Sequence, residues 1–147
     1  MNIISFKTKL GWITAAEEND QITSIKFGKK KNFGKHKTLN KLKNQIQQFS
    51  AGKRKKFSIK LKIKGTKLQK KIWQQLLKIQ YGSTTTYGEI AKKLHTSPRY
   101  IGNVCGQNNH LILIPCHRVV RSDGTLGGFS GFGGINLKRK ILKIESK

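Results

Sequence analysis

The chain has 147 residues, the size of one or two small domains. Its 31 Lys and Arg residues outnumber 6 Asp and Glu residues, so the formal net charge is +25, and 35% of its residues are hydrophobic. That apolar share allows a buried core and argues against a disordered basic tail.

No apolar run reaches the length of a membrane span, so no membrane contact is expected. The amino terminus does not resemble a secretory signal, and two cysteines cannot build a disulfide scaffold. We therefore expect a cytoplasmic protein, or a nuclear one in a eukaryote.

The positive charge predicts a polyanionic partner. Nucleic acid is the common one, because binding it releases counterions from the phosphates. The charge is spread along the chain: residues 1–64 carry 17 basic and 3 acidic side chains, and residues 65–147 carry 14 and 3. A compositional bias toward Lys is the alternative explanation, but such a bias does not by itself remove acidic residues.

The first part of the chain reads as a small sheet followed by a helix. Alternating apolar residues predict three short strands within residues 2–27, and apolar residues at helical spacing predict a helix over 37–50. The basic run 53–56 is read as a solvated linker, with a phosphate contact as the alternative. Residues 57–63 alternate as a short extended segment. We place a domain boundary at Gly65, between residues 1–64 and 65–147.

The second part is predicted to be mostly helical. Apolar residues from Leu68 to Ile79 line one face of a helix, and residues 87–94 form a second, short helix. After a tight turn at 95–96, Ser97 is suited to cap a further helix that runs to residue 107. Two short helices joined in this way form a helix-turn-helix, whose second helix enters a DNA groove with its first residues, here Arg99 and Tyr100, nearest the bases.

The most informative stretch runs from the apolar residues 111–114 to residue 118. We read the apolar run as a buried extended segment that ends at Pro115. Cys116 comes next, with His117 and Arg118 as neighbours, and cations lower the pKa of a thiol. A buried, inert cysteine is the alternative. Cys105, within a helix and without charged neighbours, fits that alternative directly.

A carboxylate in the last helix completes a candidate catalytic group. Lys138, Ile141, Leu142 and Glu145 share one helical face, so Glu145 lies beside apolar side chains and needs a partner. A histidine suits it, because a carboxylate orients the ring and stabilises its cation. The alternative is an exposed glutamate in a fraying turn. The residues therefore indicate a Cys–His–Glu arrangement with cysteine as the nucleophile.

Residues 114–120 resemble the active-site signature of the O6-alkylguanine-DNA alkyltransferases, also called methylated-DNA–protein-cysteine methyltransferases, which repair DNA. Further motifs follow that family's order and spacing: Thr86–Ala91, Ser97–Arg99, Ile101–Gly102, Asn108, Gly124–Ser130 and Lys138–Glu145. The resemblance is dense over about residues 66–146. Residues 1–64 match only in length and in their strand-then-helix pattern.

The resemblance implies roles for individual residues. The catalytic residues would be Cys116, His117, Glu145, Tyr87 and Asn108. The DNA contacts would be Arg99, Tyr87, Ser97, Tyr100 and Gly102, and the substrate pocket would be formed by Val119, Phe129, Ser130, Pro115 and Cys105. Arg99 would fill the space that a flipped base leaves in the duplex. Tyr87 would press on the 3′ phosphate and then donate to N3 of the base.

The resemblance also implies a reaction. Cys116 would attack the alkyl carbon of O6-alkylguanine, and of O4-alkylthymine, after His117 takes its proton through a water molecule. The product is a stable thioether, so each protein acts once. Double-stranded DNA is the expected partner, the protein is expected to be a monomer, and no cofactor or metal is implied. The expected fold is α+β: an amino-terminal ribonuclease-H-like sheet with a helix, and a carboxy-terminal helical domain with the helix-turn-helix.

Some residues depart from the family's pattern. Tyr100 stands where Ala or Gly is usual, Asn109 stands where Pro is common, and the loop 130–134 looks about two residues longer than in many members. Two other functions remain open. A non-catalytic helix-turn-helix DNA-binding protein would not react with alkylated DNA, and a cysteine hydrolase would turn over repeatedly on an acyl substrate.

Overall fold

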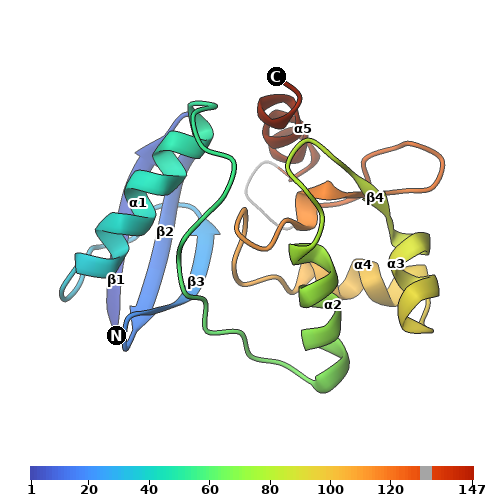
Figure 1. The fold of residues 1–147 in the computed structure, drawn as a ribbon. Coiled ribbons are helices and arrows are strands. Elements are labelled where there is room, and N and C mark those ends of the chain that lie inside the picture. The colour runs from blue at the N-terminus through green and yellow to red at the C-terminus, as the bar shows by residue number, and fades with distance from the viewer. Residues whose placement is uncertain (130–133) are drawn as a thin grey trace.

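The computed structural model describes residues 1–129 and 134–147 as a mixed α/β fold with two halves (Figure 1). The first half contains an antiparallel sheet of β1 (Asn2–Thr8), β2 (Gly11–Glu18) and β3 (Gln21–Phe27), with β2 in the centre. Helix α1 (Lys37–Ser50) covers one face of this sheet with four fully buried apolar side chains, Leu39, Leu42, Ile46 and Phe49. The three strands and the helix predicted from the sequence are confirmed.

The second half contains short helices. These are α2 (Lys67–Leu77), α3 (Tyr87–Leu94), α4 (Pro98–Gly106), the 3-10 helix η1 (Cys116–Arg118) and α5 (Gly134–Glu145). Strands β4 (Thr85–Thr86) and β5 (Val119–Val120) pair in parallel, which ties the entry to α3 to the chain just after η1. The helix predicted to run from Leu68 to Ile79 is slightly shorter than expected, since α2 ends at Leu77.

The pair α3 and α4 follows from local sequence. His95 ends α3 in the left-handed conformation (φ 56°). The Ser97 hydroxyl then accepts a hydrogen bond from the Tyr100 backbone N–H at 3.1 Å, and Pro98 occupies the first turn of α4, where it loses no hydrogen bond. These contacts confirm the predicted cap and turn.

Two apolar clusters share the segment 111–116. The sheet and α1 pack with Ile112 and Leu113 of this segment and with Leu137 and Ile141 of α5. Helices α2, α3 and α4 pack instead with Leu111, Ile114, Cys116 and Val119. Different residues of one short segment therefore enter different cores, and α5 stands between the two halves at the top of Figure 1.

The prediction of an extended segment over 111–114 is wrong. The segment is a buried turn, in which the Ile114 N–H donates to the His110 carbonyl at 2.9 Å and Ile112 adopts φ 76°. Burial in both cores satisfies the apolar pattern without a strand. Residues 57–63 join the sheet through only one short bridge, in which Ile22 exchanges backbone hydrogen bonds with Lys60 and Lys62.

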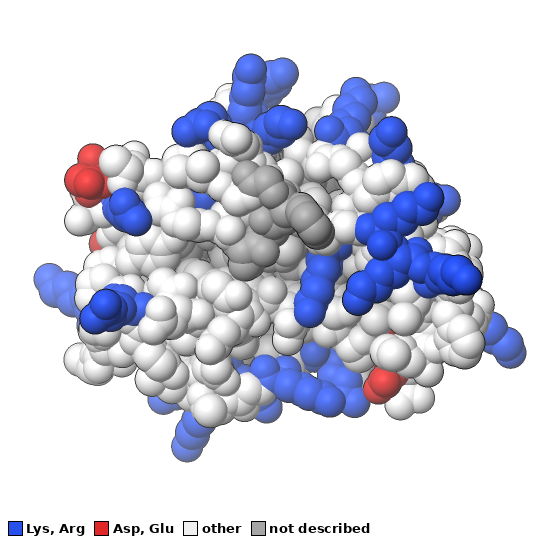
Figure 2. All heavy atoms as spheres, turned by 180° about the vertical axis from the view of Figure 1, so that it is seen from behind, with Lys and Arg blue, Asp and Glu red and all other residues white. Residues whose placement is uncertain are grey.

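Positive charge covers the surface without a matching set of ion pairs. Figure 2 shows Lys and Arg side chains around the whole outline of one face, with few acidic side chains among them. Within the described residues, the ion pairs all involve one buried carboxylate, Glu145. None of the helices in the same part of the chain combines the length and the apolar character that a membrane span requires.

Candidate active site

Cys116 is the first residue of η1 and follows the turn 111–114 and Pro115. Its side chain packs in the apolar cluster formed with α2, α3 and α4, which we call the second core. The residue is 3% exposed. Burial raises the pKa of its thiol, and a hydrogen bond from Asn108 and the positive charge of Lys138 oppose that rise. The cysteine is therefore a thiol at rest, in surroundings that supply two groups able to stabilise its anion.

Asn108 connects Cys116 to the turn that precedes it. Its amide nitrogen Nδ2 donates to Cys116 Sγ at 3.2 Å and to the Ile114 carbonyl at 2.8 Å. Its Oδ1 accepts the His110 backbone N–H at 2.8 Å. One buried side chain thus fixes the backbone at both ends of the turn before Pro115 and supplies a donor to the sulfur.

His117 and Glu145 form the predicted pair. His117 Nε2 lies 2.7 Å from Glu145 Oε2, and His117 is completely buried. If Nε2 carries the proton and donates it to the carboxylate, Nδ1 is left with its lone pair, and among the described residues Nδ1 has no hydrogen-bond partner. Burial lowers the pKa of His117, against the opposing effect of Glu145, so its neutral form is the resting one.

Arg118 joins this pair as a third member that the sequence did not single out for this role. Its guanidinium donates to both oxygens of Glu145, from Nε at 2.9 Å and from Nη2 at 2.8 Å, and from Nη1 to the Ile79 carbonyl at 2.7 Å. Burial alone would raise the pKa of Glu145, but the hydrogen bonds from His117 and Arg118 lower it to about 2. The carboxylate is therefore charged throughout the physiological range.

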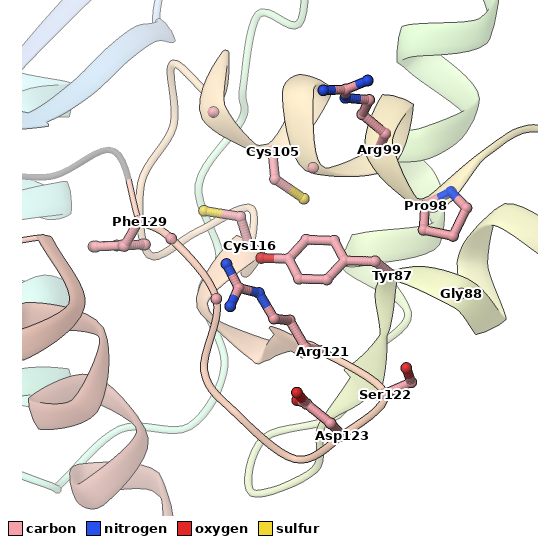
Figure 3. Close-up of a pocket in the computed structure, with 14 residues that line it drawn as sticks. Tyr87, Gly88, Pro98, Arg99, Cys105, Cys116, Arg121, Ser122, Asp123 and Phe129 are labelled. Atoms are coloured by element: carbon pink, nitrogen blue, oxygen red, sulfur yellow. The ribbon is translucent and has the colours of Figure 1, made fainter.

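A pocket of about 670 Å³ opens between α3, α4 and the segment 121–129 (Figure 3). Cys116 and Tyr87 lie in its wall, with the Tyr87 hydroxyl turned toward the Cys116 side. Burial raises the pKa of Tyr87 to about 12, so the phenol keeps its proton and can donate it. Gly127 (φ 73°) lies so close that a Cβ there would come within 3.0 Å of the Tyr87 oxygen. The glycine thus allows the chain to close over the tyrosine.

Lys138 supports the pocket from behind. It is fully buried, and its ammonium Nζ donates to the carbonyls of Val119 at 2.7 Å and of Leu126, with longer contacts to the Gly128 carbonyl and the Tyr87 hydroxyl. Burial lowers the pKa of Lys138. A fully buried lysine usually pairs with a carboxylate. The position of Lys138 on one face of its helix therefore did not indicate that backbone carbonyls would be its acceptors.

The structure brings together most of the residues singled out in the sequence. The pocket wall includes Tyr87, Arg99, Gly102, Cys105, Cys116 and Phe129. Asn108, His117 and Glu145 lie behind the wall, next to Cys116 or its neighbour, and four other residues also lie outside it. Ser97 caps α4, Tyr100 packs against the second core, Pro115 precedes η1, and Val119 is buried in β5. Ser130 and most of the loop 130–134 lie outside the described residues.

Three further wall residues, Arg121, Ser122 and Asp123, were not singled out. They follow β5 in a tight turn closed by hydrogen bonds from Arg121 N–H to the Thr125 carbonyl (2.9 Å) and from Gly124 N–H to the Arg121 carbonyl (3.0 Å). The Asp-Gly pair is a turn signal that could have marked this segment. No group of three or more metal-ligating side chains occurs within residues 1–129 and 134–147.

Comparisons with known proteins agree with this geometry. A sequence model described as the DNA binding domain of 6-O-methylguanine DNA methyltransferase matches residues 67–147. A methylated-DNA–protein-cysteine methyltransferase from Methanosarcina mazei is 39% identical over 104 residues, which are 69% of this chain and 65% of the relative. The chain thus spans just under two thirds of that relative's length. The corresponding protein from Methanosarcina acetivorans is 33% identical over 95% of both chains.

The fold agrees as well. A crystal structure of Mycobacterium tuberculosis OGT in complex with DNA superposes with a TM-score of 0.86 at 30% identity, covering 98% of this chain and 92% of that one. The class defined by the fold and by a buried cysteine beside a pocket is thus that of the DNA alkyltransferases. The chain belongs to the 6-O-methylguanine DNA methyltransferase family.

Proposed function

We propose that this protein repairs DNA by moving the alkyl group of O6-alkylguanine, and of O4-alkylthymine, onto its own Cys116. The observation that carries this proposal is the position of Cys116: in the wall of a pocket of about 670 Å³, hydrogen-bonded by Asn108 at 3.2 Å. A purine base with a small substituent fits such a volume. A buried structural cysteine would need neither the pocket nor the donor.

The alkylated base reaches the pocket by leaving the duplex. In this proposal α3 and α4 form a helix-turn-helix, and α4 enters a DNA groove with the exposed Arg99 at the lip of the pocket. Arg99 fills the space that the base vacates. Tyr87 presses on the 3′ phosphate and favours the rotation. A poorly paired, alkylated guanine costs less to unstack than a normal base, which contributes to selection.

The transfer is a substitution at the alkyl carbon. His117 Nδ1 takes the Cys116 proton through a water molecule, Glu145 holds the ring through Nε2, and Arg118 holds the carboxylate of Glu145. The sulfur bonds to the alkyl carbon as the bond from that carbon to O6 breaks. The departing guanine takes up a proton, with the Tyr87 phenol as donor to N3. The thioether product resists hydrolysis, so the protein acts once.

The two halves have different tasks in this proposal. Residues 1–64 form a ribonuclease-H-like scaffold, and residues 65–147 form the alkyltransferase domain. The first core is completed by Leu137 and Ile141 of α5, so the scaffold supports the helix that carries Glu145. Because the pocket and its catalytic groups come from one chain, the protein is proposed to work as a monomer.

Intact mass after incubation with a duplex that carries one O6-methylguanine tests the proposal. The wild-type chain should gain one methylene unit, saturating at one per protein in excess DNA. Cys116→Ser should gain none, and Cys105→Ser should still gain one. A wild-type chain that binds the duplex but gains no mass would leave a non-catalytic DNA-binding protein as the better description.

A further inference from the structure

Arg121 places a positive charge in the pocket wall through a rigid backbone. It directly follows β5, whose pairing with β4 anchors it beside the entry to Tyr87. The turn hydrogen bonds to Thr125 and Gly124 fix its main chain, and the Asp123 carboxylate tightens the same turn by accepting from the Thr125 N–H (2.9 Å) and hydroxyl (2.7 Å). In Figure 3 the guanidinium lies beside the Tyr87 hydroxyl, on the Cys116 side of the pocket.

The guanidinium of Arg121 is not paired with a carboxylate in the described structure. Within residues 1–129 and 134–147 its guanidinium forms no ion pair and no hydrogen bond, whereas Arg118 forms both and Arg54 forms hydrogen bonds. Asp123, the one acidic residue of the wall, accepts its hydrogen bonds from Thr125, and its negative charge interacts with Arg121 without forming an ion pair. Lys138 behind the wall adds a second cation, whose partners in the described structure are backbone carbonyls and the Tyr87 hydroxyl, with no carboxylate among them. The pocket is therefore positive next to the nucleophile.

A methyl group gives such a guanidinium no acceptor, and the acceptors of the base itself, such as N7, are common to every O6-alkylguanine and so do not discriminate between substituents. The part of the substrate nearest Cys116 is the O6 substituent, because that is where the bond to sulfur forms. A substituent that carries a carboxylate brings a second negative charge close to the developing thiolate, and two like charges a few ångströms apart repel each other. A guanidinium in the same pocket offsets this repulsion, and its fork of N–H donors matches a carboxylate.

We infer that Arg121 is a specificity-determining residue that favours O6-alkyl groups carrying a carboxylate, an inference that rests on the proposed alkyl transfer. With O6-carboxymethylguanine, Cys116 Sγ bonds to the methylene carbon while the bond from that carbon to O6 breaks and leaves its electron pair on the oxygen. The thiol proton passes to His117, and the released guanine takes up one proton. The product is S-carboxymethylcysteine, with its carboxylate paired to Arg121.

Single-turnover rates on three duplexes test this inference: one with O6-carboxymethylguanine, one with its neutral amide analogue, the O6-carbamoylmethyl base, and one with O6-methylguanine. The readout is the carboxymethyl-to-carbamoylmethyl rate ratio, which a general loss of folding or DNA affinity does not move. Arg121→Gln should lower this ratio about tenfold, the effect of one charge-assisted hydrogen bond. Arg121→Lys should retain most of it. Arg139→Gln, which removes an equal charge from an exposed site on α5, should leave the ratio as in the wild type.

The outcomes separate the two proposals. A ratio that is the same in wild type and Arg121→Gln overturns the inference, as does an equal fall on all three duplexes, which would assign Arg121 to the DNA backbone. Transfer of methyl but not of carboxymethyl by the wild type also overturns it and leaves the proposed function intact. Failure of the wild type on all three duplexes overturns the proposed function itself.

Discussion

At the residue scale, burial acts in opposite directions on the two groups for which we propose a proton exchange. It raises the pKa of the Cys116 thiol and lowers the pKa of the His117 imidazole, so both are neutral in the resting site. A neutral imidazole is ready to accept a proton, and a buried thiol is protected from unwanted oxidation. The hydrogen bond from Asn108 and the charge of Lys138 then stabilise the thiolate as it forms.

The pH dependence of transfer follows from these directions. His117 accepts a proton only while neutral, and its pKa lies below the ordinary value of 6.5. The transfer rate should therefore hold through neutral pH and fall only as the pH drops below 6.5. His117→Asn should lower the rate about a hundredfold or more and remove the acid limb. Rates measured between pH 5 and 8.5 at constant ionic strength check both effects.

A matched control is available in the half-buried His36, which precedes α1 and lies outside the pocket wall. His36→Gln should keep the wild-type rate and profile. An acid limb that persists in His117→Asn, or a wild-type limb centred above pH 6.5, would remove His117 from the proposed role.

At the scale of elements, short pieces of structure gather the site from distant parts of the chain. The turn 110–114, the 3-10 helix and α5 meet where the two cores meet. Helix α5 contributes Glu145 at its carboxyl end and Lys138 near its start, and Lys138 ties the helix to the carbonyls of β5 and of the segment 126–128. The helix therefore orders both the His117 pair and the pocket wall.

Replacing Lys138 should separate these contributions. Lys138→Met keeps much of the side-chain volume but leaves carbonyl groups without their donor, so the free energy of unfolding should fall by about 2 kcal/mol. The exposed Lys140 on the same helix provides the control, and Lys140→Met should change stability by less than about 0.5 kcal/mol. Urea unfolding curves give both values. Equal stability of the two variants would show that the carbonyl contacts of Lys138 contribute little.

The elements also show which features could be predicted from sequence. The strands within 2–27, α1 and the Ser97 cap follow from local patterns, because each depends on neighbours a few residues away. The turn over 111–114 could not be distinguished from a strand, since a run that is buried on all sides has no periodicity to read. The partners of Arg118 and Lys138 are distant in the sequence, such as Ile79 for Arg118, and no local signal reports such contacts. Arg121 lies in a turn that the Asp-Gly pair signals, but its place in the pocket wall depends on the fold.

At the scale of the whole molecule, the net charge of +25 is the least explained property. Ion pairs in the described structure are confined to Glu145, so the surface cations are free to interact with phosphates. Their spread over both halves of the chain suits sequence-independent contact with a duplex better than recognition of one base. We propose that the surplus lysines strengthen the search along undamaged DNA.

The salt dependence of binding tests that proposal. The logarithm of the association constant for an undamaged duplex should fall with the logarithm of salt concentration, with a slope equivalent to at least about five phosphates. Fluorescence anisotropy between roughly 50 and 300 mM salt gives the slope. A slope equivalent to one or two phosphates would confine DNA contact to the surroundings of α4.

The identity of the acceptor sulfur is the most direct measurement of all. Trypsin releases Cys105 and Cys116 together in the peptide Tyr100–Arg118, so fragmentation of that peptide must separate them. After incubation with a duplex carrying O6-methylguanine, the added methylene should appear only in fragments that contain Cys116, with an equal amount of guanine restored in the DNA. A methylene on Cys105, or restored guanine without any modified cysteine, would contradict direct transfer to Cys116.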